Sequence, residues 1–343
     1  MTKKIIFTGG GTGWHITPLI SLHNYLNEDG NYEYMWLGER DSLEEETAEK
    51  YHIEFHDISA WKIRRYFDVR NFYEPLKNLT GIFESLYYIL RYKGNIVFSK
   101  GGFVSVPACI AAFILRKKIY IHESDAVMGL ANKITSRFAT KVFTSFPLSN
   151  KKKYIHSGHI LNPEMIDSVK SLSKKENEHL NVLVIAGSQW SETIFENLVQ
   201  ILPDCQDIEF HVVLGTNSNT ELQLSLRHFP NVKVYGFIPQ SELAKIYIKS
   251  DIAITRGSST LWELFYFGIH SIIIPLRATG GDHQMKNAQY FHENYGSDIL
   301  DEEENLHLEL FRKIQKYKWL RKRDLNLEWY FDGLKAIQEE IEK

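Results

Sequence analysis

Short apolar runs alternate with longer amphipathic segments along the first half of the chain. Residues 5–8 and 34–37 are typical of buried strands, and residues 17–27 between them have the periodicity of a helix. Further strands are expected at residues 95–99, 118–122 and 141–144. Apolar strands that alternate with helices predict a parallel sheet that is covered by helices on both faces.

The same pattern starts again after a polar, lysine- and glutamate-rich segment at residues 168–180. A helix is expected at 191–202, and strands are expected at 181–186, 209–214, 232–235, 252–255 and 271–275. Two such series predict an α/β chain of two doubly wound, Rossmann-like domains. Ligands of these folds bind beyond the carboxyl ends of the strands, so the loops of both domains should face a cleft. We expect domains at 1–160 and 161–324, and a C-terminal helix at about 325–343 that can pack back on the first domain.

Composition narrows the classes of function. Hydrophobic residues make up 43% and charged residues 24%, as in ordinary soluble domains, and the net charge of −3 gives no reason to expect nucleic acid. Cys109 and Cys205 are the two cysteines and form no CxxC pair, so a cytoplasmic protein without a disulfide framework or a zinc site is expected. The longest apolar run, residues 104–115, is shorter than the ~20 residues that span a bilayer. The N-terminus begins with a strand rather than a signal peptide.

Three loops of the first domain could carry chemistry. Thr8-Gly9-Gly10-Gly11-Thr12-Gly13-Trp14-His15 lies between a strand and a helix, where backbone N–H groups bind phosphate, although a plain glycine turn is an equal alternative. Gly101 and Gly102 follow a second strand and permit close backbone approach. His122-Glu123-Ser124-Asp125 places three ionisable groups at the end of a third strand, which favours a site over a core.

The second domain has comparable loops. Gly187-Ser188-Gln189 and Gly257-Ser258-Ser259-Thr260 each follow a strand and precede a helix, which suits a diphosphate. Glu263, one turn further on, can accept two hydrogen bonds from a ribose diol. Capping of the helix by Ser259 or Thr260 is the alternative interpretation. The polar segment at residues 280–288 is either a solvated loop or a contact surface for sugar hydroxyls.

Taken in order, these segments resemble the MurG-type N-acetylglucosaminyltransferases of peptidoglycan synthesis, along nearly the whole chain. The shared motifs are Gly-Gly-Thr-Gly-Trp-His with Pro18, Gly-Gly-Phe-Val-Ser-Val-Pro, His-Glu-Ser-Asp with Gly129 and Asn132, Gly-Ser-Gln, the segment from Gly257 to Glu263, and Asp-His-Gln-Met-Lys-Asn-Ala. The resemblance implies the GT-B architecture and an inverting transfer that needs neither metal nor cofactor. N-acetylglucosamine would pass from UDP-N-acetylglucosamine to the muramoyl 4-hydroxyl of undecaprenyl-pyrophosphate-linked lipid I, forming lipid II.

The resemblance also implies roles for individual residues. The second domain would bind the donor, and the first domain would bind the lipid-linked acceptor. The implied donor-binding residues are Ser188, Gln189, Phe237, Ile238, Ser259, Thr260, Glu263 and Gln284. The implied acceptor-binding residues are Gly11, Thr12, Gly13, Trp14, Gly102 and Asn132. His15 is the first candidate for the catalytic base because an unperturbed pKa of ~6.5 suits that role, and Glu123 and Asp125 are the alternatives.

An anionic membrane surface is a further expected partner. Residues 61–93 mix aromatic side chains with lysines and arginines, including Arg64 and Arg65, as in peripheral proteins at a lipid interface. The expected location is the inner face of the plasma membrane. The alternative is an ordinary core helix with a solvated face, which is expected to account for residues 86–90.

The sequence departs from the family pattern at five places. Trp14 replaces a glycine, Asp125 an asparagine, Trp190-Ser191 a Gly-Ala pair, and Asn162 lies where an arginine is usual; the segment from Gly257 to Glu263 is one residue short. These departures leave open a transferase for another lipid or lipid-linked acceptor. They also leave open a UDP-sugar epimerase of the same fold and a binding protein that has lost catalysis.

Overall fold

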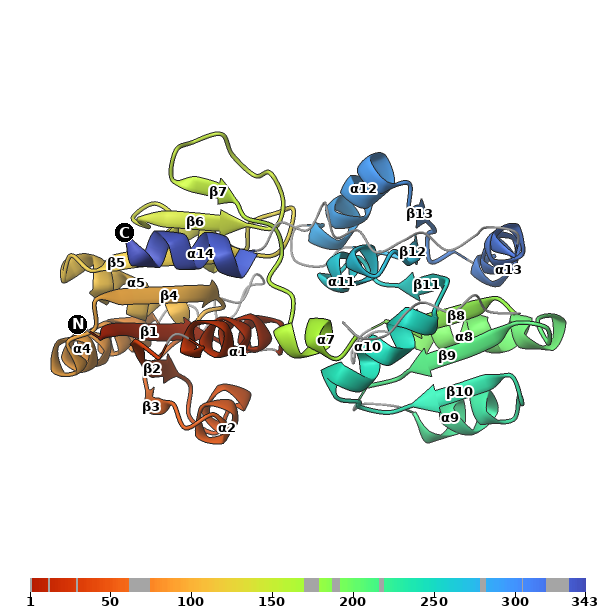
Figure 1. Cartoon of the computed structure of the whole chain (residues 1–343), viewed down its shortest axis with the longest axis horizontal. Helices are drawn as coiled ribbons and strands as arrows, with labels where there is room; N and C mark the ends of the chain where they lie inside the picture. The colour runs from red at the N-terminus through yellow and green to blue at the C-terminus, as the bar shows by residue number, and fades with distance from the viewer. Residues whose placement is uncertain are drawn as a thin grey trace. The chain divides into compact units, whose positions relative to one another are not determined.

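The computed structural model describes residues 2–11, 13–28, 30–61, 75–169, 179–186, 192–215, 219–277, 282–303, 305–318 and 333–343. The chain divides into two compact units (Figure 1). The first comprises Met1–Ile160 with Phe331–Lys343, and the second comprises Leu161–Tyr330.

The first unit is built on a seven-stranded parallel sheet in the order β3-β2-β1-β4-β5-β6-β7. Its strands are β1 (Lys3–Gly9), β2 (Tyr32–Gly38), β3 (Glu54–Asp57), β4 (Ile96–Gly101), β5 (Lys118–Glu123), β6 (Lys141–Thr144) and β7 (Tyr154–His156). Its helices are α1 (Gly13–Asn27), α2 (Leu43–Lys50), α4 (Pro75–Tyr92), α5 (Ser105–Ile114), α6 (Leu130–Thr135) and α14 (Gly333–Glu342). The direction of winding reverses between β1 and β4, so the loops after these two strands lie beside each other.

The second unit repeats this plan with a six-stranded parallel sheet in the order β10-β9-β8-β11-β12-β13. Its strands are β8 (Asn181–Ile185), β9 (Glu209–Val213), β10 (Val232–Tyr235), β11 (Ile252–Thr255), β12 (His270–Ile273) and β13 (Asp298–Ile299). Its helices are α7 (Pro163–Asp167), α8 (Glu192–Ile201), α9 (Thr220–Arg227), α10 (Gln240–Lys249), α11 (Thr260–Tyr266), α12 (His283–Tyr295) and α13 (Leu306–Tyr317), with a short 3-10 helix, η1 (Leu202–Asp204). Here the winding reverses between β8 and β11.

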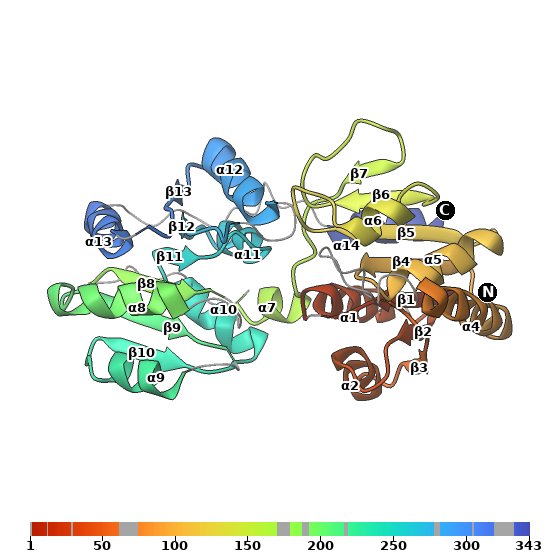
Figure 2. The same cartoon turned by 180° about the vertical axis from the view of Figure 1, so that it is seen from behind.

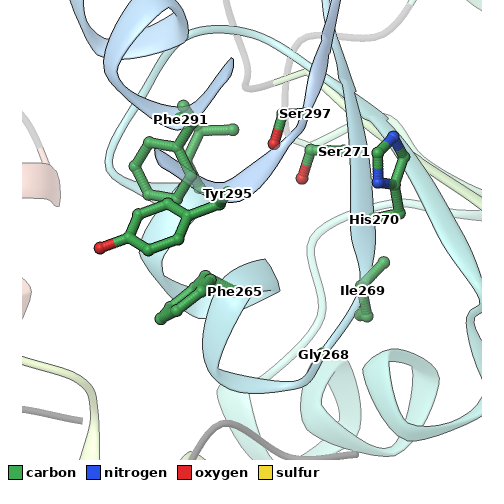
Figure 3. A pocket seen from close by; sticks show the side chains of 9 residues that line it. Phe265, Gly268, Ile269, His270, Ser271, Phe291, Tyr295 and Ser297 are labelled. Carbon is green, nitrogen blue, oxygen red and sulfur yellow. The ribbon is translucent and has the colours of Figure 1, made fainter. Parts of the chain in front are cut away.

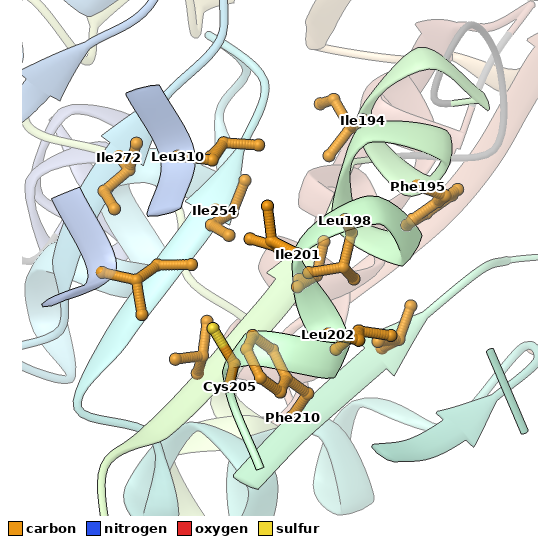
Figure 4. Close-up of a cluster of buried hydrophobic side chains, with 14 of the residues drawn as sticks. Ile194, Phe195, Leu198, Ile201, Leu202, Cys205, Phe210, Ile254, Ile272 and Leu310 are labelled. Atoms are coloured by element: carbon orange, nitrogen blue, oxygen red, sulfur yellow. The ribbon is translucent and has the colours of Figure 1, made fainter. Parts of the chain in front are cut away.

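Helices cover both faces of each sheet, because successive side chains of a buried strand point to opposite sides. In β1, Ile5 and Phe7 pack with α1 and α14, whereas Ile6 packs with α4 and α5. Figures 1 and 2 show these two layers from opposite sides. In the second unit, one cluster joins α8 and α13 to the sheet (Figure 4) and the other joins α10 and α11 to it. Burial on both faces explains why the central strands have continuous apolar runs rather than apolar residues at alternate positions, with polar residues at their carboxyl ends.

The C-terminal helix α14 packs on the first unit. Leu334, Ile337 and Ile341 are buried among residues of α1 and β1. The Tyr120 hydroxyl donates to the Glu340 carbonyl at 2.9 Å, and Lys3 Nζ donates to the Ile341 carbonyl at 2.9 Å. The last residues of the chain thus complete the core of the unit that contains its first residues.

The predicted fold class is confirmed, with two differences in the elements. Helix α1 begins at Gly13 rather than at residue 17, so that Trp14 and His15 lie in its first turn. Strands β3, β7 and β13 were not expected; they are short, lie at or next to the sheet edges, and contain polar residues. Among the described residues, no helix is long and apolar enough to cross a membrane.

A buried polar cluster attaches β13 to the second unit. The Asp298 carboxylate accepts hydrogen bonds from Lys313 and Tyr317 of α13, and His270 Nε2 lies 3.1 Å from it. Burial alone would raise the pKa of Asp298, but the bonds from Lys313, Tyr317 and His270 outweigh burial and lower the pKa to about 2. Side-chain bonds therefore compensate for the short backbone ladder of a two-residue strand.

We expect Tyr317→Phe to weaken the attachment of β13 by about 1.5–3 kcal/mol at neutral pH, the usual value of a hydrogen bond to a charged group. A carboxylate with a lowered pKa stabilises the fold above its unfolded pKa of 3.8, and this stability is lost as the pH falls towards about 2. The difference between the variant and the wild type should therefore shrink over that range. Hydrogen exchange of the β12, β13 and α13 amides measures it, with Tyr154→Phe in the first unit as the control. Equal protection of both proteins at pH 7 would contradict the prediction.

Candidate functional site

Two glycine loops meet at the carboxyl ends of β1 and β4. Gly102 has a φ of +84°, and a Cβ atom on it would lie 2.6 Å from the Gly10 carbonyl oxygen. Gly9 is similarly close to Gly101, whose carbonyl oxygen would lie 3.2 Å from a Cβ atom at Gly9. Glycine is needed at Gly102 both for its backbone angle and for this close approach.

A buried carboxylate holds the first of these loops from its other side. Glu44 of α2 is only 2% exposed, and its Oε1 accepts a hydrogen bond from the Gly11 N–H at 2.9 Å. A Cβ atom on Gly10 would lie 1.4 Å from the same oxygen. The Gly11 N–H, which was expected to face an acceptor pyrophosphate, is thus engaged by the protein itself. Sequence analysis missed Glu44 because it lies among the acidic residues that are common in the first turn of a helix.

His15 is a partly buried residue in the first turn of α1. Burial and the nearby Lys100 ammonium lower its pKa to about 4, against a hydrogen bond to the Gly10 backbone that raises it. The imidazole is therefore neutral at physiological pH. Because one ring nitrogen donates to Gly10, the other is left as an acceptor. Trp14 has ordinary helical backbone. Its side chain, like all of Thr12, lies outside the described residues.

Glu123 lies at the end of β5, 5% exposed and surrounded by donors. Its carboxylate accepts from the N–H groups of Ser124 at 2.9 Å, Asp125 at 3.2 Å and Gly129 at 3.0 Å. The Asn132 amide adds a fourth bond at 3.0 Å. Burial and Asp125 raise the pKa of Glu123, while Lys100 and these donors lower it. With four donors on two oxygens, this carboxylate holds the loop together and is poorly placed to accept a further proton.

Asn132 connects this loop to the second glycine loop. Its side chain is 4% exposed, and a Cβ atom on Gly101 would lie 3.0 Å from its amide group. Asp125 is partly buried and lies beside Glu123. The structure thus brings His15, Glu123, Asp125, Asn132 and Gly102 together at one edge of the first sheet.

Sequence analysis also missed Lys100, the last residue but one of β4. It is 3% exposed, and its Nζ donates to the Ser124 hydroxyl at 2.6 Å. A lysine in an otherwise apolar strand was the available signal, since lysines are almost never fully buried without a partner.

In the second unit, Glu263 of α11 is the centre of the candidate site. Burial raises its pKa to about 7, partly offset by a hydrogen bond of 2.8 Å from the hydroxyl of Tyr247 in α10. Tyr247 is fully buried and was not identified from the sequence. Ser259 and Thr260 are buried at the start of the same helix, and Ser259 makes no side-chain capping bond there. Of the two residues that the alternative interpretation named as caps, Ser259 is therefore wrong.

The first turn of α12 packs against the loop that contains Gly257 and precedes α11. A Cβ atom on Gly257 would lie 2.2 Å from the Gln284 carbonyl oxygen, and Asn287 Nδ2 donates to the Gly257 carbonyl at 3.0 Å. Gln284 Oε1 accepts from the Leu276 N–H at 2.9 Å. The structure thus brings Gln284 beside the loop that leads to Glu263.

The remaining donor-binding candidates are Phe237, Ile238, Ser188 and Gln189. Phe237 follows β10 with its ring 77% exposed, while Ile238 is partly buried against the core. Ser188 and Gln189 lie outside the described residues. Among the described residues, no group of three or more His, Cys, Asp or Glu side chains could hold a metal ion.

A small pocket in the second unit is not part of this site. Figure 3 shows Phe265, Phe291 and Tyr295 on one side of it and His270 with Ser271 on the other. His270 and Ser271 begin β12, so the pocket lies at the amino end of that strand. Ligands of doubly wound sheets bind at the carboxyl ends.

Comparison with known proteins agrees with this geometry. Residues 5–144 match the glycosyltransferase family 28 N-terminal domain, and residues 181–326 match the glycosyltransferase family 28 C-terminal domain. The chain is 34% identical over 345 residues to the UDP-N-acetylglucosamine–N-acetylmuramyl-(pentapeptide) pyrophosphoryl-undecaprenol N-acetylglucosamine transferase of Clostridium kluyveri, a match that covers 97% of this chain and 95% of the relative.

Solved structures share the fold. The crystal structure of Acinetobacter baumannii MurG superposes with a TM-score of 0.77 at 22% identity, covering 99% of this chain and 98% of that one. The UDP-GlcNAc 2-epimerase of Neisseria meningitidis gives 0.68 at 13% identity, with 99% of both chains covered. Identities this low show the fold alone, so the family is decided by the relatives of higher identity. The chain belongs to the UDP-N-acetylglucosamine–N-acetylmuramyl-(pentapeptide) pyrophosphoryl-undecaprenol N-acetylglucosamine transferases, and it is a glycosyltransferase of the GT-B fold.

Proposed function

We propose that this protein transfers N-acetylglucosamine from UDP-N-acetylglucosamine to the muramoyl 4-hydroxyl of an undecaprenyl-pyrophosphate-linked muramoyl pentapeptide. The observation that carries the proposal is the match to the Clostridium kluyveri transferase along 97% of this chain. The acceptor hydroxyl attacks the anomeric carbon with inversion, UDP leaves, and a base takes the hydroxyl proton. The proposal includes no metal ion. The epimerase alternative is weaker, because only the fold supports it.

The donor binds to the second unit in this proposal. Glu263 accepts hydrogen bonds from the ribose diol, and the Tyr247 hydroxyl holds its carboxylate in place. Gln284 contacts the sugar, and the exposed ring of Phe237 lies on the segment that contacts uracil. Ser259 and Thr260, with Ser188 and Gln189, meet the diphosphate.

The acceptor binds at the edge of the first sheet, and His15 is the base. Glu123 is the weaker candidate because four donors already occupy its carboxylate. A pKa of about 4 makes His15 neutral but only weakly basic in the free protein. The pyrophosphate of a bound acceptor would bring negative charge close to the imidazole. A nearby anion raises the pKa of a histidine, so acceptor binding would strengthen the base as it positions the hydroxyl.

We expect Glu263→Gln to raise the Kd of UDP about tenfold to hundredfold at pH 8, because a charge-assisted bond is worth about 1.5–3 kcal/mol. The raised pKa of about 7 means that the wild-type carboxylate protonates as the pH falls below 7. The affinity of the wild type should therefore fall towards that of the variant by pH 6, whereas the variant should show no such dependence. Titration calorimetry measures both. Glu242→Gln, an exposed acid on α10, is the control, and equal affinities at pH 8 would refute the assignment.

We expect the purified protein to release UDP from UDP-N-acetylglucosamine in the presence of the lipid-linked muramoyl acceptor and not with lipid carrier alone. His15→Ala should lower kcat by ~10²–10⁴, the usual contribution of a positioned base, with the KM of the donor unchanged. With the donor saturating, the acid limb of kcat/KM for the acceptor should lie near pH 4, the pKa of the free imidazole, rather than near 6.5. Absence of acceptor-dependent release would contradict the proposed function, and wild-type turnover in the variant would transfer the role to Asp125 or Glu123.

We also propose that the protein binds peripherally to the inner face of the plasma membrane through helix α4. Its exposed apolar side chains are Leu79 (53%), Phe83 (70%), Tyr87 (55%) and Leu90 (59%). Spacings of four, four and three residues place them on one face, while Ile89 is buried against α5. Leu90 was expected in the core and is instead exposed, because it follows the buried Ile89 directly and neighbouring residues of a helix point to different faces. The exposed Lys77 and Arg91 flank the stripe, and Arg64 and Arg65 lie outside the described residues.

The double variant Phe83→Ser/Tyr87→Ser should lose at least roughly tenfold in binding to vesicles that contain anionic lipid, since a fully buried aromatic side chain contributes about 1.5–3 kcal/mol. Vesicle sedimentation provides the measurement. Leu224→Ser, at a leucine 67% exposed on α9, is the matched control and should bind as the wild type does. Unchanged sedimentation of the double variant would exclude α4 as the membrane contact.

A further inference from the structure

Lys100 is a buried cation that the proposed displacement does not use. It adjoins both glycine loops, because it directly precedes Gly101 and because a Cβ atom on Gly9 would come within 3.1 Å of the Lys100 Cβ. Its ammonium donates to the Ser124 hydroxyl at 2.6 Å and is shielded from solvent. Burying an ammonium is costly, and a protein retains one only where nearby groups compensate it.

Ionisable side chains from several elements surround this ammonium. They are His15 of α1, His122 and Glu123 of β5, Asp125 of the loop after β5, and His159 after β7. Burial lowers the pKa of Lys100, and the two acids among the five, Glu123 and Asp125, raise it and so favour the ammonium form. The other three are histidines that burial and Lys100 both keep neutral by lowering their pKa values.

A chain of hydrogen bonds links Lys100 to the candidate acceptor site. The ammonium holds the Ser124 hydroxyl, and the Ser124 N–H donates to Glu123 at 2.9 Å. Glu123 in turn binds the Asn132 amide at 3.0 Å, which packs against Gly101. The cation thus sits at one end of a connected network that includes the second glycine loop.

The charge of Lys100 acts on both candidate bases in the same direction. It lowers the pKa of Glu123 against burial and Asp125, which raise it. It also adds to burial in lowering the pKa of His15. Removal of the cation would therefore let both groups take up protons at higher pH.

We propose that Lys100 is a positioning residue of the transfer reaction: its buried side chain, bonded to the Ser124 hydroxyl, fixes Glu123 and Asn132 through Ser124 and holds a positive charge beside the candidate bases. The inference rests on the proposed function. Lys100 touches no reacting atom in this scheme; it acts through Ser124 and through its charge.

The test compares Lys100→Met, which removes the charge at similar volume, with Lys100→Arg, which keeps it. The matched control is Lys118→Met, an exposed lysine at the opposite end of β5. For each protein, kcat/KM for the lipid-linked acceptor is measured at saturating donor from pH 3.5 to 8, a range that includes the wild-type limb near pH 4, together with the KM of UDP-N-acetylglucosamine. Nitrogen-15 NMR of the histidine imidazoles, assigned with His15→Ala, follows the protonation of His15 without reference to turnover.

In Lys100→Met, the acid limb of kcat/KM and the NMR titration of His15 should both move up by about one pH unit or more, the effect of removing one nearby charge. Lys100→Arg and Lys118→Met should keep the wild-type limb, and the donor KM should stay the same in all three. A uniformly slower Lys100→Met enzyme with an unchanged limb and an unchanged His15 titration would overturn the proposal. A wild type without acceptor-dependent turnover would instead contradict the proposed function, while the NMR titration would still test Lys100.

Lys100→Met leaves a buried Glu123 without its cation, so the variant can fail to fold. The variant Lys100→Gln also removes the charge but keeps a polar group that can bond to the Ser124 hydroxyl, and the proposal expects the same upward shift of the limb and of the His15 titration in it. If neither variant folds, Lys100 serves folding rather than the protonation of His15, and the proposal is wrong.

Discussion

The close approach of Gly10 and Gly102 is the contact on which the site of the first unit depends. The Gly10 carbonyl lies 2.6 Å from the position of a Cβ atom on Gly102, so any other residue there would push the two loops apart. Glu44 holds Gly10 and Gly11 from the other side. With the first loop fixed in this way, α1 begins at Gly13 and His15 falls in its first turn. With the second loop fixed, the side chain of Lys100 lies next to both glycine loops.

In the second unit, a close backbone contact also joins two segments of the candidate site, but different side chains surround it. Gly257 lies against the backbone of Gln284 and is held by Asn287, which joins the loop after β11 to the start of α12. Arg256, directly before Gly257, is 4% exposed and paired with Glu302 at 2.6 Å, while the Glu263 carboxylate is held by the phenol of Tyr247. One winding pattern thus supports sites with different side-chain chemistry in the two units, in agreement with the principle that a fold does not determine its sites.

The sequence predicted the fold well because its main signal is local. The central strands contain continuous apolar runs, and each is followed by a glycine loop or a helical pattern. Strand β13, two residues long and fixed largely by side chains of α13, gives no such signal. Residues of the candidate site were identified from the sequence only where they lie within one short, contiguous motif. The bonds between Lys100 and Ser124, Gly11 and Glu44, and Tyr247 and Glu263 join residues 24, 33 and 16 positions apart, so no short motif contains them.

The departures from the family pattern also have different physical meanings. Asn162, where the family usually has an arginine, caps α7 by accepting from the Glu164 N–H at 2.9 Å. It thus has a structural role that an arginine could not fill in the same way, since Asn is a preferred N-cap residue. Trp14 has helical backbone, so the usual glycine at its position is not needed for an unusual φ angle in this chain.

The two candidate groups for donor binding and proton transfer respond to pH in separate ranges. Glu263 binds a diol best when ionised, and its pKa is raised to about 7; His15 must be neutral, and its pKa is lowered to about 4. Burial shifts both, but in opposite directions, because it disfavours the charged form of an acid and of a base alike. On mild acidification, the proposed enzyme would therefore lose affinity for its donor well before it loses its base. Between these two pKa values a saturating donor concentration restores turnover, because the uptake of one proton by Glu263 weakens binding and leaves the proton transfer in the other unit unaffected.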